Sequence, residues 1–318
     1  MFCVACRSGE SYARPALIHG IEFLLDKYRL KSGGYASRTT ISGDIIPGPI
    51  DLYDLSFCLF ALAHSYEILR DSRLKDEAIS LVKFIAVQFK HPSGGYAESI
   101  PATQPRRQNP HMHLLEALLE WRRLSDEVIF SNISDEMTSL FFDKFYQSEV
   151  GALLEYFDDE LNPALDMRAG ITEPGHHYEW VWLLKRYQDI ANCNVQAYDK
   201  LYNFARQYGV NTRSGLLWGE VTSVGAPRGL RVRIWPHTEW VKAELARGES
   251  RDLSERVTQA WNALSGFLNC PQPGLWYETY DHERENYLVE PSPASSFYHI
   301  VLAIESLNEY VKTQSLAQ

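Results

Sequence analysis

Four short segments of the chain combine histidines and carboxylates at spacings suited to proton transfer. They are residues 109–116 (NPHMHLLE), 173–179 (EPGHHYE), 235–239 (WPHTE) and 293–299 (PASSFYH). Histidine is the side chain whose ordinary pKa lies closest to neutral pH, so it can both take and return a proton. We therefore treat the four segments as candidate parts of one acid–base site.

Three of these histidines recur at a regular interval. His113, His176 and His299 are separated by 63 and 123 residues, close to one and two units of the repeat described below. Folding alone does not require an imidazole at a repeated position, so we expect the three side chains to converge on one cavity. Glu116 and Glu179 each follow a histidine by three residues, which places each on the same helix face as that histidine.

A metal site is the competing interpretation of the same residues. Two His-x-x-Glu pairs resemble parts of dinuclear carboxylate sites, but those sites use Glu-x-x-His together with further glutamates. The sequence contains no HExxH motif, no GxSxG nucleophile elbow and no glycine-rich phosphate loop. The pattern therefore favours histidine catalysis, with neither metal nor cofactor, over a metalloenzyme or a serine hydrolase.

A repeated unit positions these segments. Turns of glycine followed by apolar or aromatic residues occur at Gly34, Gly95, Gly151, Gly215 and Gly274, which are 61, 56, 64 and 59 residues apart. A nearly fixed period of this size indicates one supersecondary unit used several times.

Each glycine turn follows an amphipathic helical stretch and precedes a more apolar one, with apolar residues at i, i+3, i+4 and i+7. The amphipathic stretches are residues 16–30, 72–90, 131–147, 193–209 and 251–269, and the apolar ones are 51–69, 111–124, 175–190, 237–246 and 295–310. No alternating strand pattern of five residues or more lies outside the loops. We expect an all-α toroid in which the apolar helices form the inner ring. The loops before them would frame a ligand site.

The composition narrows the class of protein. The 318 residues carry a formal net charge of −10, which disfavours nucleic acid as a partner because phosphate binding needs a basic face. No apolar run approaches the roughly 20 residues that cross a membrane, and the first residues do not resemble a signal peptide. The five cysteines are scattered and odd in number, which argues against a disulfide framework. We expect a cytoplasmic protein without a membrane partner.

The four segments resemble those of the N-acylglucosamine 2-epimerase superfamily, which includes mannose isomerases and cellobiose 2-epimerases. The resemblance rests on NPHMHLLEALLEW, EPGHHYEWVWLL, RIWPHTEW and PASSFYHIVLAIE and covers roughly residues 14–312. It implies an (α/α)6 barrel and a metal-independent reaction on a small reducing sugar, with no cofactor.

The resemblance also implies the catalytic residues. His176 and His299 match the two catalytic histidines, and Glu179 matches a glutamate that orients the site and that could hold one imidazole tautomer. One imidazole would remove the proton at C2 of the open-chain sugar, and the other would open the ring and protonate the cis-enediolate. Return of the proton to C1 gives a ketose, and return to the opposite face of C2 gives an epimer.

Further residues correspond to the sugar pocket of the family. His113 matches a histidine that contacts the sugar, and Trp235, Glu239 and Glu116 match other pocket residues. The combination of segments is closer to the mannose-isomerase side, so we predict a mannose/fructose-type isomerase. A sugar 2-epimerase is the first alternative, since the same histidines serve both reactions. An inactive relative that binds a sugar or a protein is the second.

The repeat count departs from the family. We count five helical hairpins where the family closes at six, and we find no match for the arginine that the family's first pair supplies. We expect an irregular segment over residues 1–13, a barrel domain over 14–312 and a tail over 313–318. An N-terminal pair is missing from this pattern, which predicts that the chain derives from a longer protein, fills the gap by forming a homo-oligomer, or aggregates.

Overall fold

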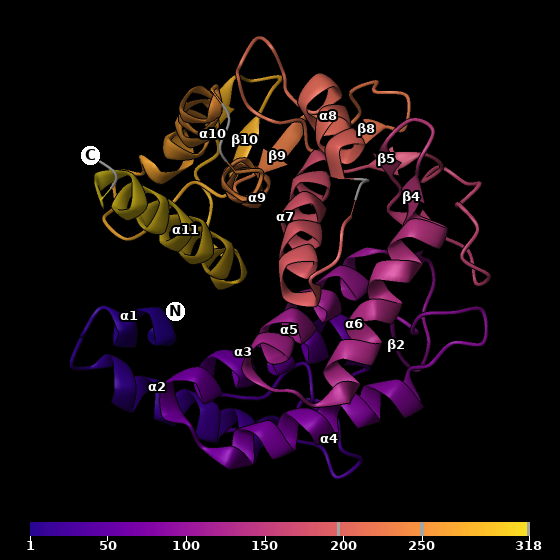
Figure 1. Ribbon diagram of the computed structural model, residues 1–318, viewed down its shortest axis with the longest axis vertical. Helices are drawn as coiled ribbons and strands as arrows, with labels where there is room; N and C mark the ends of the chain where they lie inside the picture. The colour runs from indigo at the N-terminus through magenta and orange to yellow at the C-terminus, as the bar shows by residue number, and fades with distance from the viewer. Residues whose placement is uncertain (196–197, 249–250, 317–318) are drawn as a thin grey trace. The chain divides into compact units, whose positions relative to one another are not determined.

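The computed structural model describes residues 1–195, 198–248 and 251–316, and its helices and short strands are shown in Figure 1. Two compact units make up the chain. The first unit contains Met1–Phe145 and Tyr156–Ala169, and the second contains Tyr146–Glu155 and the chain from Gly170 onward. Each unit is described by itself.

The first unit is built from pairs of antiparallel helices and a few very short strands. Its helices are α1 (Phe2–Arg7), α2 (Ala13–Phe23), α3 (Leu52–Leu69), α4 (Ser72–Gln88), α5 (Asn109–Leu124) and α6 (Val128–Leu140), with π-helical turns at Leu24–Tyr28 and Phe141–Phe145. Its strands are β1 (Ile50–Asp51), β2 (Ser99–Ile100), β3 (Arg106–Arg107) and β6 (Tyr156–Phe157).

The second unit repeats this plan. Its helices are α7 (Pro174–Ala191), α8 (Tyr198–Tyr208), α9 (Trp235–Ala246), α10 (Leu253–Leu268) and α11 (Phe297–Leu316), and a 3-10 turn over Ala294–Ser296 leads into α11. Its strands are β4 (Tyr146–Gln147), β5 (Ala152–Leu153), β7 (Ile171–Thr172), β8 (Val221–Thr222), β9 (Arg231–Arg233), β10 (Thr279–Asp281) and β11 (Asn286–Tyr287).

Helix pairs alternate in how deeply they are buried, as their sequences predict. In α4 the buried residues Leu74, Ala78, Leu81, Val82 and Ile85 form one stripe, typical of a helix with one face in water. In α5 every residue over 110–121 is buried, so this helix is covered on all sides. Within the first unit α3 packs on both α4 and α5, and within the second α9 packs on α7, α10 and α11. We call α3, α5, α7, α9 and α11 the inner helices.

Short strands directly before α3, α5, α7 and α9 pair with strands in the turn of a neighbouring hairpin. Antiparallel pairs form between β1 and β2, β3 and β6, β4 and β5, β7 and β8, and β9, β10 and β11. Among the described residues no strand exceeds three residues. The prediction of a helical framework without long strands is therefore confirmed.

The glycine turns require glycine at specific positions. Gly95 and Gly151 have φ values of +62° and +78°, a region that L side chains rarely adopt. A Cβ atom on Gly95 would lie 2.8 Å from Nε2 of His111, and one on Gly151 would lie 2.7 Å from the carbonyl oxygen of Lys200. These turns thus allow a neighbouring helix to approach the backbone closely, α5 at Gly95 and α8 at Gly151.

A buried histidine fastens three of these turns to the inner helices. The backbone N–H groups of Tyr96, Leu153 and Leu217 donate to Nε2 of His111, His177 and His237, at 3.0, 3.0 and 3.1 Å. In each ring Nδ1 donates to the carbonyl oxygen four residues earlier, at 2.9, 2.9 and 3.2 Å. We call His111, His177 and His237 the turn-clamp histidines. Each ring satisfies one backbone donor and one acceptor at a buried helix start.

This clamp defines the register of the repeat, and the register differs from the one that the sequence spacing predicts. Two residues after the clamp histidines stand His113, Glu179 and Glu239, so these three are equivalent positions. His176 directly precedes the turn-clamp histidine His177. The equivalent residue in the other two repeats is a proline, Pro110 or Pro236. The expected equivalence of His113 and His176 is therefore wrong, because insertions in the loops change the spacing between units.

The N-terminus is not the irregular segment that the sequence predicts. Residues 2–7 form α1, which packs against α2 and α3, as an inner helix packs against its neighbours. Cys3 is buried. A helix of six residues is unstable alone, so its order depends on these tertiary contacts, which local sequence patterns do not reveal.

Other helix boundaries follow the predicted stretches with small shifts. The predicted tail over 313–318 is largely incorrect, since α11 continues to Leu316; residues 317–318 lie outside the described residues. Of the predicted helix over 193–209, the described residues Tyr198–Tyr208 form α8, and residues 196–197 lie outside the described chain. In the described part of the chain, no helix combines the length and the apolar character needed to cross a membrane.

Candidate active site

Helix α7 presents His176 in its first turn, two residues after the proline that begins the helix. The imidazole is buried, and its Nδ1 donates to Oε2 of Glu155 at 3.0 Å. Oε2 of Glu173 lies 3.8 Å from the same nitrogen. The other oxygen of Glu155 accepts from the backbone N–H of Glu173, at 3.3 Å. Two carboxylates therefore surround one ring nitrogen.

These carboxylates give His176 a positive charge at neutral pH. Burial alone lowers the pKa of the imidazole, but Glu155, and after it Glu173, outweigh burial and raise the pKa to about 10. Burial raises the pKa of Glu173, against the lowering effect of the imidazolium. The charge on His176 is thus stabilised by paired carboxylates in a place that excludes most water.

His299 occupies the first turn of α11, after the 3-10 turn. Its Nδ1 donates to Oε1 of Glu239 at 2.7 Å. A carboxylate oxygen of Glu179 lies within 4.8 Å of a carboxylate oxygen of Glu239 and of a ring nitrogen of His299. In this second histidine, too, a buried carboxylate holds Nδ1, so the neutral form of the ring would carry its lone pair on Nε2.

The indole of Trp235 contacts both histidines. Its ring centroid lies 4.8 Å from that of His176 and 5.6 Å from that of His299, at interplanar angles of 37° and 33°. Trp235 is the first residue of α9 and is largely buried. The two imidazoles, which come from α7 and α11, thus flank one aromatic ring in the second unit.

Glu239 is fully buried and carries a charge. Burial raises the pKa of its carboxyl, but the ammonium of Lys242, and after it His299, lower the pKa well below its usual range. Nζ of Lys242 lies 2.7 Å from Oε2 of Glu239, and both side chains are fully buried. The hydroxyl of Thr238 donates to Oε1 at 3.3 Å.

His113 and Glu116 form their own pair in the first unit, on α5. Nδ1 of His113 donates to Oε2 of Glu116 at 3.0 Å, and both side chains are buried. The imidazole packs against the rings of Tyr53 and Phe57 on α3, with both pairs of centroids 4.9 Å apart. The shared helix face predicted for this pair is therefore confirmed. Its convergence with the other two histidines stays a prediction.

One expected contact is replaced by another. The sequence predicts that Glu179 holds an imidazole tautomer; at Nδ1 of His176, Glu155 does so instead. Sequence reasoning missed Glu155 and Lys242. A signal for Glu155 exists, because the turns GGYAE, GALLEYF and GLWYE each carry a glutamate three or four residues after the last glycine. Glu98 and Glu278 from the equivalent turns are also buried, and each bonds an arginine, at 2.7 and 2.5 Å.

Histidines grouped with carboxylates are also typical of metal sites. Two such groups lie within the second unit, Glu155–Glu173–His176 and Glu179–Glu239–His299, with their ligand atoms within 4.8 Å of one another. In the first group the imidazole is itself a cation. In the second the ammonium of Lys242 lies against Glu239. These positive charges disfavour a further cation, so the side chains fit acid–base chemistry better than metal binding.

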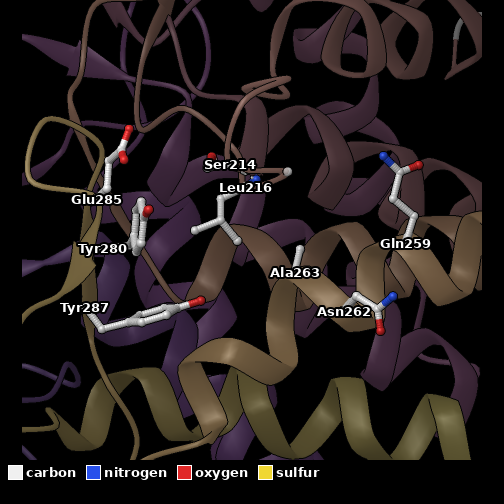
Figure 2. Close-up of a pocket in the computed structure, with 9 residues that line it drawn as sticks. Ser214, Leu216, Gln259, Asn262, Ala263, Tyr280, Glu285 and Tyr287 are labelled. Atoms are coloured by element: carbon white, nitrogen blue, oxygen red, sulfur yellow. Dashed lines mark hydrogen bonds between the residues drawn. The ribbon is translucent and has the colours of Figure 1, made fainter.

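A separate cavity of about 460 Å³ lies elsewhere in the second unit (Figure 2). Figure 2 shows Tyr280, Tyr287 and Glu285 on one side of it and Gln259 and Asn262 of α10 on the other. The remaining lining residues are Ser214, Gly215, Leu216 and Ala263. None of the lining residues is a predicted site residue.

Comparison with known proteins shows the family and the fold of the chain. The sequence profile described as N-acylglucosamine 2-epimerase matches residues 1–303. A protein named mannose-6-phosphate isomerase, from Rhizobium meliloti (strain 1021), is 33% identical over 98% of this chain and 84% of its own length.

Solved structures with the same fold include a D-mannose isomerase, with a TM-score of 0.85, 20% identity, and coverage of 97% of this chain and 84% of its own. The cellobiose 2-epimerase from Spirochaeta thermophila DSM 6192 has a TM-score of 0.85 at 17% identity, over 98% of this chain and 84% of its own. These likenesses confirm the predicted all-α fold of the α/α-barrel type.

Proposed function

The chain belongs to the N-acylglucosamine 2-epimerase family, and on that premise we propose that it interconverts an aldose and a ketose of the mannose/fructose type with two histidines and no metal. That it is a carbohydrate isomerase or epimerase follows from the family. The finer proposal concerns the sugar, the catalytic residues and the absence of a metal requirement.

One observation carries the proposal. His176 and His299 flank the indole of Trp235, and each has its Nδ1 bonded to a buried carboxylate. An imidazole fixed in this way directs Nε2 at the substrate and is stabilised when it becomes charged. Two such groups, one acting as the acid and one as the base, are what a proton transfer between neighbouring carbons requires.

The two histidines differ in the charges around them, which suggests their roles. His176 is an imidazolium, and we assign it as the acid at O1 and O2 of the sugar. His299 lies beside a carboxylate whose charge is balanced by Lys242, and we assign it as the base.

The reaction then proceeds in balanced steps. Nε2 of His299 takes the proton from C2, the electron pair of the C–H bond forms the C1=C2 double bond, and the carbonyl electrons move to O1. His176 gives its proton to O1, forming the cis-enediol. His176 next takes the proton from O2 as the C2=O bond forms, and C1 receives the proton held by His299. Both histidines return to their starting states.

The other predicted site residues would bind the sugar. We expect Glu179 and Trp235 to contact it close to the reacting carbons, because both lie beside the catalytic pair. His113, held by Glu116, would donate to a sugar hydroxyl.

A 2-epimerase is the second candidate, favoured by the likeness to proteins named cellobiose 2-epimerase. One of these, from Dictyoglomus turgidum (strain DSM 6724 / Z-1310), is 25% identical over 86% of this chain and 74% of its own length. The same two imidazoles would serve, with the proton returned to the opposite face of C2.

The test is incubation with mannose, fructose, glucose and N-acetylmannosamine in heavy water, followed by NMR at C1 and C2. We expect mannose and fructose to interconvert and to gain deuterium. Exchange confined to C2, with a new aldose as product, would favour the epimerase. No exchange with any of these sugars would contradict the proposed isomerase.

A further inference from the structure

A buried lysine lies behind the pair formed by Glu239 and His299. Lys242 follows Glu239 by three residues on α9, so the two side chains share a helix face. Both side chains are fully buried, and Nζ lies 2.7 Å from Oε2 of Glu239. The same ammonium lies over the ring of Trp182 on α7, 3.8 Å from its centroid.

The carboxylate of Glu239 connects the lysine to the histidine. Its Oε2 meets Lys242, and its Oε1 accepts from Nδ1 of His299 at 2.7 Å. A buried ammonium is costly unless it is paired, and this one is paired with a group that bonds a predicted catalytic side chain. An ordinary stabilising ion pair has no need to lie in that position.

Resting on the proposed function, we propose that Lys242 is a positioning residue: it keeps Glu239 ionised and fixed so that His299 is held as a neutral base. The ammonium does not touch the sugar and acts through Glu239.

The charged groups around His299 explain why a cation is needed. Glu239 on α9 bonds the imidazole, and the carboxylate of Glu179 on α7 lies within 4.8 Å of the same group. On α11 the ring of Tyr298 lies 3.9 Å from that of His299, centroid to centroid. Without Lys242 the imidazole of His299 would face the carboxylates of Glu239 and Glu179 with no ammonium beside them. Two carboxylates favour the imidazolium, which cannot act as a base.

The same helix offers a matched control. Glu244 on α9 accepts from Arg256 on α10 at 2.6 Å, and both side chains are buried. The oxygens of Glu244 also accept from Tyr202 and Trp240, at 2.9 Å each. Replacing Arg256 removes a buried cation that pairs with α9 through Glu244 and not through Glu239, so the stability cost can be separated from the effect on His299.

The experiment compares Lys242→Met, Lys242→Arg and Arg256→Met with the parent protein. For Lys242→Met we expect kcat at pH 7 to fall at least about tenfold with a smaller change in KM. The acid limb of the pH profile should move to higher pH by about one unit or more, because removing a cation raises the pKa of the Glu239–His299 pair. Lys242→Arg should keep the parent profile. Arg256→Met should lower the unfolding temperature and leave the profile in place.

A second measurement is independent of turnover. The His299 imidazole is titrated by NMR in the parent and in Lys242→Met, with the signal assigned by its loss in His299→Asn. A titration midpoint that rises in Lys242→Met supports the inference, even if no sugar proves to be a substrate and the proposed function fails. An unchanged midpoint overturns it, even if the parent is an active isomerase. If Lys242→Met does not fold, Lys242→Gln replaces it in both measurements.

Discussion

His176 and His177 are consecutive residues of α7, both are buried, and yet they differ in charge. The pKa of His176 is raised to about 10 by Glu155 and Glu173, against burial. The pKa of His177 is lowered to about 4 by burial, and its ring bonds the uncharged backbone groups of Leu153 and Glu173. The partner atoms of a buried histidine, rather than burial itself, therefore decide whether it can do acid–base work or only hold a turn.

The same contrast separates the two histidine sets of the second unit. His176 and His299 each bond a carboxylate through Nδ1. His177 and His237 each bond a backbone carbonyl through Nδ1 and a turn N–H through Nε2. In the turn-clamp rings both nitrogens are committed to the backbone, which leaves no lone pair for a substrate.

The largest expected effect comes from replacing the carboxylate-bound histidines. His176→Asn and His299→Asn should each lower kcat by about 10²–10⁴, the usual contribution of a general acid or base. The fold should survive, because an asparagine amide can still donate to Glu155 or Glu239. Turnover is measured on the sugar identified in heavy water, and near-parent turnover in either variant would disprove the two-histidine mechanism.

The same substitution at the next residue, His177, should lower stability rather than turnover. In His177→Asn the clamp on Leu153 is lost or weakened, which should lower the free energy of unfolding by about 1–3 kcal/mol. The activity of the folded protein should stay within about a factor of ten of the parent, since the ring would not provide the general acid or base. Denaturant unfolding and turnover, measured together, would contradict this if His177→Asn proved as inactive as His176→Asn and as stable as the parent.

The contributions of His176 and His177 to the free energy of unfolding should depend on pH in opposite directions. The folded pKa of His177, about 4, lies below the ordinary value of 6.5. Its contribution to the free energy of unfolding is therefore fully present above pH 6.5 and is lost as the pH falls towards 4. The folded pKa of His176, about 10, lies above 6.5, so its contribution is present below 6.5 and is lost as the pH rises towards 10.

Unfolding free energies measured from pH 4 to 10 check this prediction. His177→Asn should flatten the slope below pH 6.5, by an amount on the order of 3 kcal/mol over that range. His176→Asn should flatten the slope above pH 6.5. If both variants changed the same limb of the curve, the assignment of charge to the two rings would be wrong.

The smallest expected effect is that of a chelator. If imidazoles carry the proton and Lys242 occupies the cation position beside Glu239, EDTA should leave the turnover unchanged. Assays with and without EDTA, followed by addition of divalent ions, measure this. Activity lost with EDTA and restored by one ion would assign the carboxylate–histidine groups of the second unit as metal ligands.

The sequence by itself determined the helical repeat and the residue types of the site. Apolar residues at i, i+3, i+4 and i+7 depend only on the local period of a helix, so α4 and α10 could be predicted from their own residues. The pair formed by His113 and Glu116 was likewise predictable, because two residues three positions apart on a helix lie on the same face and close together. The helix α1 was not, because six residues hold their shape only through contacts with α2 and α3.

Only the tertiary structure decided which carboxylate meets which histidine. Glu155 lies 21 residues before His176, and Glu239 lies 60 residues before His299. Both pairings depend on how a glycine turn or a neighbouring helix packs against the helix that carries the imidazole. No periodicity encodes that packing, and a loop insertion of a few residues changes the spacing without changing the contact. For that reason the sequence could offer Glu179 only as a carboxylate that holds one of the imidazoles, and for His176 the folded chain provides Glu155.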